Sequence, residues 1–186
     1  MNTNEILKIV GINAKAIPTA LYMLAGNEKL AQEARGFDRP ERVAVKQDAG
    51  SVNPESGVVE LTPEIIMAIH KKLVEMFSGS PAILEQGTFE ELCISPYGCY
   101  FGTVLFPSVF DKAAKYLRGF DGSQVFADGN KRTSIMTAMT FLAINGYRFT
   151  MPEDEIVELV MSVAQDKNIT EERIARIFEE NCEAVE

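Results

Sequence analysis

The chain has 186 residues, 46% of them hydrophobic, which is enough apolar material for the core of a globular domain. Its 27 acidic residues outnumber its 18 basic ones, and the net charge of −9 argues against direct nucleic-acid binding, which needs a basic surface. No signal peptide and no apolar run of about 18 residues is present, so we expect a cytoplasmic protein that does not bind membranes. The three cysteines lack a Cys-x-x-Cys spacing, and we expect buried free thiols.

The N-terminal part of the chain has weak patterns. Residues 4–35 resemble two short helices, residues 42–46 a short strand, and residues 47–57 a linker rich in Gly, Pro, Asn and Ser. We therefore separate an N-terminal extension of unknown function, residues 1–57, from a domain at residues 58–186.

The second part has strong helical periodicity. Thr62 and Pro63 mark the first helix start, and Gly146 marks the end of the longest helix. In chain order we predict helices at 62–77 and 81–93, a hairpin or flap within 97–106, helices at 108–119 and 129–145, a strand at 147–150, a helix that begins near Pro152, and a last helix at 170–182. The predicted fold class is mainly α, a compact helical bundle with a small β-hairpin flap.

Asp128-Gly129-Asn130-Lys131-Arg132 stands at the start of the longest predicted helix. A helix N-terminus carries free N–H groups and a positive dipole end, so it can hold an anion. The dipole disfavours two cations there by a few tenths of a kcal/mol each, so their position indicates a ligand. Gly129, Asn130 and Lys131 would form a phosphate cradle, and the Asn130 side chain would orient the loop by its own hydrogen bonds. Arg132 would clamp two oxygens, and Asp128 would contact Mg²⁺. The alternative is that Asp128 caps the helix and the two cations are solvated.

The stretch F-x-D-G-N-K-R-T, residues 126–133, followed by an apolar helix and F-L-x-x-N-G-Y, resembles the core motif of the Fic/Doc (Fido) superfamily. Two features resemble its Doc (death-on-curing) branch: Lys131 stands where Fic proteins have a second glycine, and Ile135 where they have a second arginine. LTPEIIMAIHKKL and FPSVFDKAAKYLRGF resemble flanking helices of such domains. The resemblance covers roughly residues 58–182.

The resemblance implies a compact, mainly α domain that uses ATP and Mg²⁺ to transfer phosphate or AMP to a hydroxyl side chain of a target protein, of which a translation factor is one candidate. It implies an antitoxin protein as a further partner. It also assigns roles: Asp128 becomes the metal contact, residues 129–131 the phosphate-binding residues, Arg132 a catalytic phosphate clamp and Phe126 a core plug. The hairpin near Tyr100–Leu105 would pair with the target backbone as an added strand.

One position departs from the family motif. The histidine that takes the proton from the target hydroxyl is replaced by Gln124, and the following Pro by Val125. An amide has no useful basicity at pH 7, and the loss of a general base costs about 10²- to 10⁴-fold in rate. Neither candidate substitute fits, since we expect His70 to be a packed or partly exposed residue of its helix and Asp121 to be an ordinary turn residue.

Two main hypotheses follow. The first is a Doc-like transferase that is slow or uses another base. The second is a catalytically impaired Fido domain that acts as a nucleotide- or protein-binding regulatory module. In a weaker third hypothesis, the N-terminal region inhibits the domain through Ser51–Ser56, although Pro54 and the final Ser break the inhibitory pattern.

Overall fold

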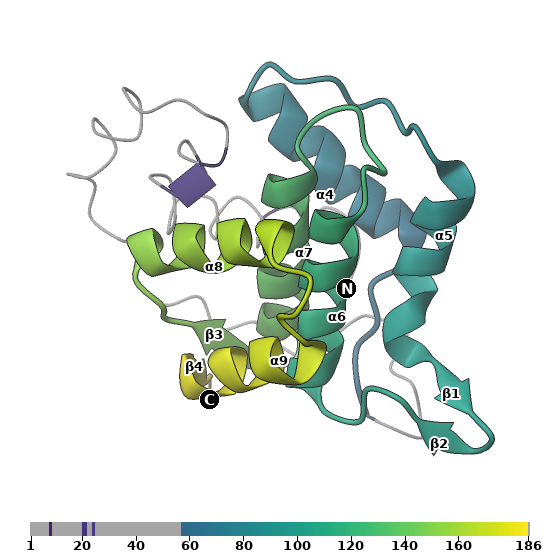
Figure 1. Ribbon diagram of the computed structural model, residues 1–186, viewed down its shortest axis with the longest axis vertical. Coiled ribbons are helices and arrows are strands. Elements are labelled where there is room, and N and C mark those ends of the chain that lie inside the picture. The colour runs from purple at the N-terminus through teal and green to yellow at the C-terminus, as the bar shows by residue number, and fades with distance from the viewer. Residues whose placement is uncertain (1–7, 9–19, 22–23, 25–56, 186) are drawn as a thin grey trace.

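The computed structural model describes residues 8, 20, 21, 24 and 57–185, and helices α4 to α9 make up most of this part (Figure 1). Their bounds are α4 Pro63–Met76, α5 Gln86–Ile94, α6 Val109–Gly122, α7 Asn130–Ile144, α8 Glu153–Gln165 and α9 Glu171–Glu180. A 3₁₀ turn, Ser95–Tyr97, follows α5. Two antiparallel hairpins complete the described fold: β1 Cys99–Tyr100 with β2 Thr103–Val104, and β3 Tyr147–Phe149 with β4 Cys182–Ala184. The predicted mainly α class is confirmed.

Helix α7 forms the centre of the domain. Every side chain from Arg132 to Leu142 is buried, so this helix has no solvent face over three turns. Helix α6 packs along it, and α8 and α9 cover the other side of α6 (Figure 1). The aromatic rings of Tyr116, Phe120 and Phe141 fill the space between α6 and α7. This packing fixes the start of α7, where the motif lies.

Local signals set several element ends. Helix α4 follows Thr62 as predicted, with Pro63 at its first position. Helix α6 begins at a complete capping box, in which the backbone N–H of Asp111 donates to Ser108 Oγ at 3.0 Å and the N–H of Ser108 donates to Asp111 Oδ2 at 2.9 Å. Gly146 adopts a φ of 84° directly after α7, which is the left-handed conformation expected of a glycine at a helix end.

Two predicted helices are shorter than expected. The helix predicted at 81–93 begins only at Gln86, because the preceding residues pair with the motif loop instead: Leu84 N–H donates to Val125 O at 2.7 Å, and Ala127 N–H donates to Ala82 O at 2.9 Å. The last helix ends at Glu180, and residues 182–184 pair with β3 as β4, a strand that the sequence pattern did not indicate.

The predicted hairpin is present, but at a distance from the motif. Helix α6 begins shortly after β2 and ends just before the motif loop, so the hairpin and the loop lie at opposite ends of this 14-residue helix (Figure 1). At 1.5 Å per residue the separation is about 20 Å. Residues 82–85, rather than the hairpin, border the motif loop.

Part of the N-terminal region joins the same core. Ala20 and Leu21 are helical and fully buried, and the N–H of Ala20 donates to Glu153 Oε2 at 2.9 Å. The strand predicted at 42–46, the linker up to residue 56 and the segment Ser51–Ser56 lie outside the described residues, so the boundary at residue 57 stays a prediction.

The structure also bears on the expected burial of the cysteines and on membrane-spanning helices. Cys93 is buried and Cys182 partly buried, as expected, but Cys99 is exposed on β1. Within the described residues no helix is both long and apolar enough to span a bilayer.

Candidate functional site

The loop that leads into α7 is held in place by the side chain of Asn130. Its Oδ1 accepts a hydrogen bond from the N–H of Phe126 at 3.0 Å, and its Nδ2 donates to the carbonyl of the same residue at 2.8 Å. Asn130 was predicted to belong to the phosphate cradle and to orient the loop by its own hydrogen bonds, and both ends of its amide do fix the loop. Its contribution to an anion site is therefore the backbone N–H at the first position of α7.

Phe126 anchors the loop in the core, as predicted for a core plug. It is 1% exposed and stacks on His70, with ring centroids 3.7 Å apart and an interplanar angle of 11°. His70 Nδ1 in turn lies 2.9 Å from Thr133 Oγ1 on α7. Burial, assisted by the nearby Arg132 charge, lowers the pKa of His70 to about 4, so the ring is neutral at pH 7. Of the two expected alternatives, a packed or a partly exposed histidine, the structure shows the packed one. The burial of His70 keeps it from acting as a base at the position of Gln124.

Asp128 and Arg132 form an ion pair one helical turn apart. Asp128 Oδ1 accepts from Arg132 Nη2 at 2.9 Å and from the N–H of Gly129 at 2.6 Å. Gly129 occupies the N-cap position with a φ of 75°, and the side chain of Asp128 does not cap the helix. Gly79 leaves space for the carboxylate, because a Cβ there would lie 2.2 Å from Asp128 Oδ2.

Arg132 is a buried cation with an unused donor. Only 4% of its side chain is exposed, and its guanidinium carbon lies 5.0 Å from the centroid of the Phe77 ring. Its Nη1 is buried and makes no hydrogen bond within the described residues. An unsatisfied donor on a buried charge is costly, and an anion bound beside it would remove that cost. The alternative of a solvated cation is therefore wrong for Arg132, while Lys131 stays partly exposed.

The donor set at this helix start fits phosphate together with a hard divalent cation. No group of three or more His, Cys, Asp or Glu side chains suited to a metal occurs in the described residues, so a cage made only of protein ligands is not found there. Mg²⁺ commonly binds through one or two carboxylates together with phosphate oxygens. Asp128 can supply such a carboxylate, and Arg132 and the first N–H groups of α7 can supply the phosphate contacts.

Gln124, which replaces the family histidine, and Asp121, which lies three residues before it, differ in exposure. Gln124 is exposed. Asp121, which we expected in a turn, lies in the last turn of α6, and both its carboxylate oxygens are buried without a hydrogen bond among the described residues. Burial raises the pKa of Asp121 to about 6, although Lys131 and Arg118 oppose this shift. Because these oxygens are shielded from solvent, Asp121 is not placed to receive a proton from a molecule at Gln124.

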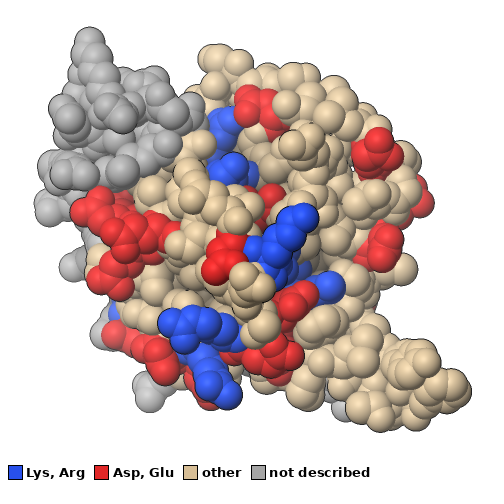
Figure 2. All heavy atoms as spheres, in the orientation of Figure 1, with Lys and Arg blue, Asp and Glu red and all other residues tan. Residues whose placement is uncertain are grey.

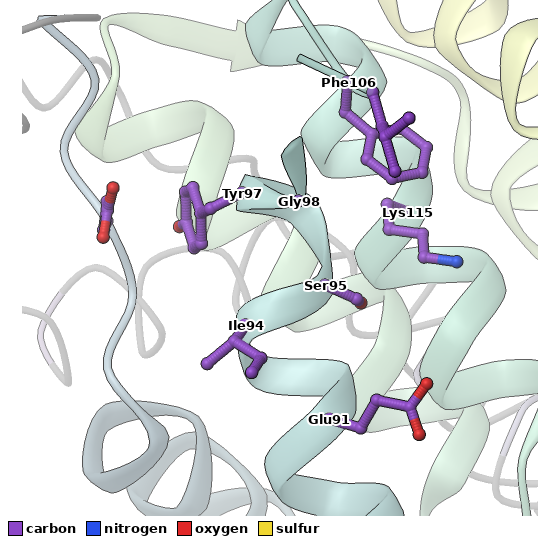
Figure 3. A pocket seen from close by; sticks show the side chains of 9 residues that line it. Glu91, Ile94, Ser95, Tyr97, Gly98, Phe106 and Lys115 are labelled. Atoms are coloured by element: carbon purple, nitrogen blue, oxygen red, sulfur yellow. The ribbon is translucent and has the colours of Figure 1, made fainter. Parts of the chain in front are cut away.

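A cavity of about 640 Å³ lies away from this site, next to the hairpin (Figure 3). Tyr97, Leu105 and Lys115 are among the residues that line it, and none of the predicted site residues does. The hairpin projects beside it, and Figure 2 shows this projection at the lower right without Lys, Arg, Asp or Glu. The cavity is therefore a separate feature from the motif.

Comparison with known proteins agrees with the motif. Residues 60–142 match the model of the Fic/DOC family. This region belongs to the Fic/DOC family. Among curated proteins, the chain is 32% identical over 78 residues to Toxin Doc of Mycolicibacterium smegmatis, which covers 42% of this chain and 60% of that protein. It is 29% identical over 94 residues to Protein kinase doc of Escherichia phage P1, which covers 50% of this chain and 74% of that protein.

The family match ends within α7, so it includes the whole motif from Gln124 to Arg132 but not α8, α9 or the second hairpin. Because the chain spans only 60% of the first relative, the activity and partners of that protein do not pass to this one by similarity alone. The family match is consistent with the mainly α fold, and the matched region contains the loop before α7.

Proposed function

We propose that this Fic/DOC domain is a toxin-like, nucleotide-dependent transferase that moves phosphate or AMP from ATP to a side chain of a target protein. Transfer to a hydroxyl acceptor would be slow, because Gln124 cannot take its proton. The observation that carries the proposal is the buried Arg132, which pairs with Asp128 through Nη2 and keeps Nη1 without a partner in the described residues. The names of the two relatives, a toxin and a protein kinase, support the same class of activity.

Each residue at the start of α7 has a task in this proposal. Arg132 and the free N–H groups of α7 bind the phosphate oxygens, while Lys131 adds a positive charge at the exposed side. Asp128 holds Mg²⁺, which supplies charge neutralisation on the phosphates when it is bound. Asn130 fixes the loop before α7 through its two hydrogen bonds to the backbone of Phe126. A cytoplasmic location, a target such as a translation factor and restraint by an antitoxin belong to the proposal as well.

The test is labelled transfer. The protein is incubated with Mg²⁺, a lysate and ATP labelled at either the α- or the γ-phosphate, and protein-bound label is measured. Label from γ-ATP indicates phosphate transfer, and label from α-ATP indicates AMP transfer. Arg132→Lys serves as a matched variant, because it keeps the charge but loses the two-pronged contact, and we expect at least about tenfold less label. The absence of label from both nucleotides would contradict the proposal.

A second function is favoured by a specific observation. Gln124 is exposed and not basic, and the two substitutes considered for the base, His70 and Asp121, are buried. A domain of this kind could bind nucleotide and regulate a protein partner without transfer. Gln124→His distinguishes the two: a large gain in transfer to a hydroxyl would show that the cradle is competent, whereas tight MgATP binding with no transfer in either form would favour the regulatory module.

A further inference from the structure

The tip of the β1–β2 hairpin exposes two aromatic rings. Tyr100 and Phe101 are 65% and 92% exposed, and their ring centroids lie 4.5 Å apart at an interplanar angle of 74°. Phe101 has a φ of 46° and precedes Gly102 in the turn, a position that suits Asn or Gly and is strained for a bulky residue. Neither burial nor backbone preference explains a phenylalanine there. The two rings, which we call the aromatic wedge, therefore indicate a binding partner.

The stem of the hairpin holds the aromatic wedge in a fixed position. The N–H of Leu105 donates to the carbonyl of Gly98 at 3.0 Å, which closes the stem. Where the chain leaves the hairpin, the ammonium group of Lys112 donates to the carbonyl of Phe106, and only 3% of Lys112 is exposed. A wedge that is already ordered loses little conformational entropy when it binds.

The hairpin also lacks charge. It belongs to residues 92–110, the longest stretch of the sequence without Lys, Arg, Asp or Glu. The next longest, residues 133–147, is explained by the burial of α7, whereas the hairpin is exposed (Figure 2). Two copies of a chain with a net charge of −9 repel each other. The uncharged hairpin is a surface on which they can approach without that repulsion.

A concave counterpart lies beside the aromatic wedge. The cavity of about 640 Å³ shares Leu105 with the hairpin stem and has apolar walls at Ile94 and Phe106 (Figure 3). Pockets that enclose a drug-sized ligand have volumes of about 300–1,000 Å³, so two side-chain rings fit. Tyr100 and Phe101 do not line this cavity, and their exposure shows that they do not fill it. One chain thus carries a wedge and a cavity side by side, each without the other.

We infer that two copies of this chain form a two-fold dimer in which the aromatic wedge of each copy enters the cavity of the other. Because wedge and cavity are neighbours on one face, a two-fold rotation brings both pairs into contact at once. This inference goes beyond the proposed function, because the motif lies about 20 Å away at the other end of α6. The dimer leaves the start of α7 open.

The exposed apolar area is sufficient for a weak dimer of this form. At their observed exposure the two rings can bury about 240–390 Å² per copy. Ile94, Val104 and Leu105, which are 65%, 51% and 53% exposed, add to this area. Counted over both copies and with the cavity walls, the contact reaches the roughly 1,000 Å² that a specific interface needs. A single wedge in a single cavity gives half of this area, which favours the symmetric pair.

Sedimentation velocity of the full chain, from about 1 to about 200 µM, measures the association. We expect the weight-average mass to rise from 20.6 kDa toward twice that value, with a dissociation constant of about 10 µM. Added MgATP should change this constant by less than about twofold, because the two sites are separate. A chain that stays monomeric at about 200 µM would overturn the dimer and leave the wedge to a different protein.

Two variants separate the wedge from the cavity. Phe101→Asn removes the ring and suits the positive φ, so we expect at least about tenfold weaker association. Its urea midpoint, measured at about 1 µM where the chain is monomeric, should stay equal or rise. Ile94→Lys places a charge on the cavity wall, and we expect a similar loss of association. Met161→Gln, at an exposed position on α8, is the control and should associate as the parent does.

Each contrary outcome has a distinct meaning. A lower urea midpoint for Phe101→Asn would give the ring a role inside the monomer and overturn the inference. Loss of association in Phe101→Asn but not in Ile94→Lys would mean that the wedges do not enter the cavities. An equal loss in Met161→Gln would place the contact elsewhere on the surface. All three outcomes overturn the dimer and leave the proposed transferase untouched, since MgATP binding is measured separately by calorimetry.

Discussion

Asp121 provides the sharpest test of the packing around the motif. Its carboxylate oxygens are buried without a hydrogen bond in the described part of the chain, and only 9% of the residue is exposed. Burial raises its pKa from the ordinary 3.8 to about 6. The unfolded chain therefore loses this proton at a lower pH than the folded chain does. As the pH rises from about 4 to about 6, Asp121 destabilises the fold increasingly, and the penalty is complete above pH 6.

The substitution Asp121→Asn keeps the shape of the side chain and removes the charge. A pKa difference of about two units corresponds to about 3 kcal/mol at pH 8. At pH 5 the native carboxyl is mostly protonated, and the penalty is only about 1.5 kcal/mol. We expect Asp121→Asn to be more stable than the parent chain at pH 8, with an advantage that shrinks by about 1.5 kcal/mol between pH 8 and pH 5.

Urea unfolding followed by far-UV circular dichroism at pH 5, 6, 7 and 8 measures this difference. Glu158→Gln is the matched control, because it removes one negative charge from an exposed position on α8. Its effect should stay within about 0.5 kcal/mol at every pH. A stability difference between Asp121→Asn and the parent that does not change with pH would refute the reasoning, since it would mean that Asp121 is hydrated or paired in solution.

Two further predictions concern the loop before α7. Gly79→Ala should weaken MgATP binding at least about tenfold in calorimetry, because the new methyl group would collide with the carboxylate of Asp128. Gly87→Ala on α5 is the control, since a Cβ there meets no atom within 4 Å, and equal losses in both variants would contradict the steric argument. Asn130→Ala should lower the free energy of unfolding by about 1–3 kcal/mol, because the buried N–H and carbonyl of Phe126 lose their partner. Thermal or urea unfolding checks this, and an unchanged midpoint would mean that the two hydrogen bonds do not stabilise the loop.

The features that the sequence predicted correctly depend on short-range chemistry. Thr62-Pro63 starts a helix and Gly146 ends one because both signals act within a single turn. The apolar spacing in α7 was sufficient to locate the core helix. These are properties of neighbouring residues, so a linear pattern contains them.

The features that the sequence did not predict depend on contacts between distant residues. The segment at 82–85 looked helical, and it is extended because its backbone pairs with the motif loop about 40 residues later. Strand β4 exists through its pairing with β3. Asn130 was expected to orient the loop by its own hydrogen bonds, and it does, but the sequence did not indicate that Phe126 is its partner. The burial of Asp121 depends on the helices that cover α6, and no signal in its own neighbourhood indicates it.

The position of the β1–β2 hairpin has a consequence for inhibition. Its tip carries the exposed rings of Tyr100 and Phe101, and the whole of α6 separates it from the start of α7. A protein that bound only this tip would leave the phosphate site open and could be bound at the same time as ATP. In kinetic terms it would be a noncompetitive ligand: it would lower kcat, if it acted at all, without changing the concentration of ATP that half-saturates the domain.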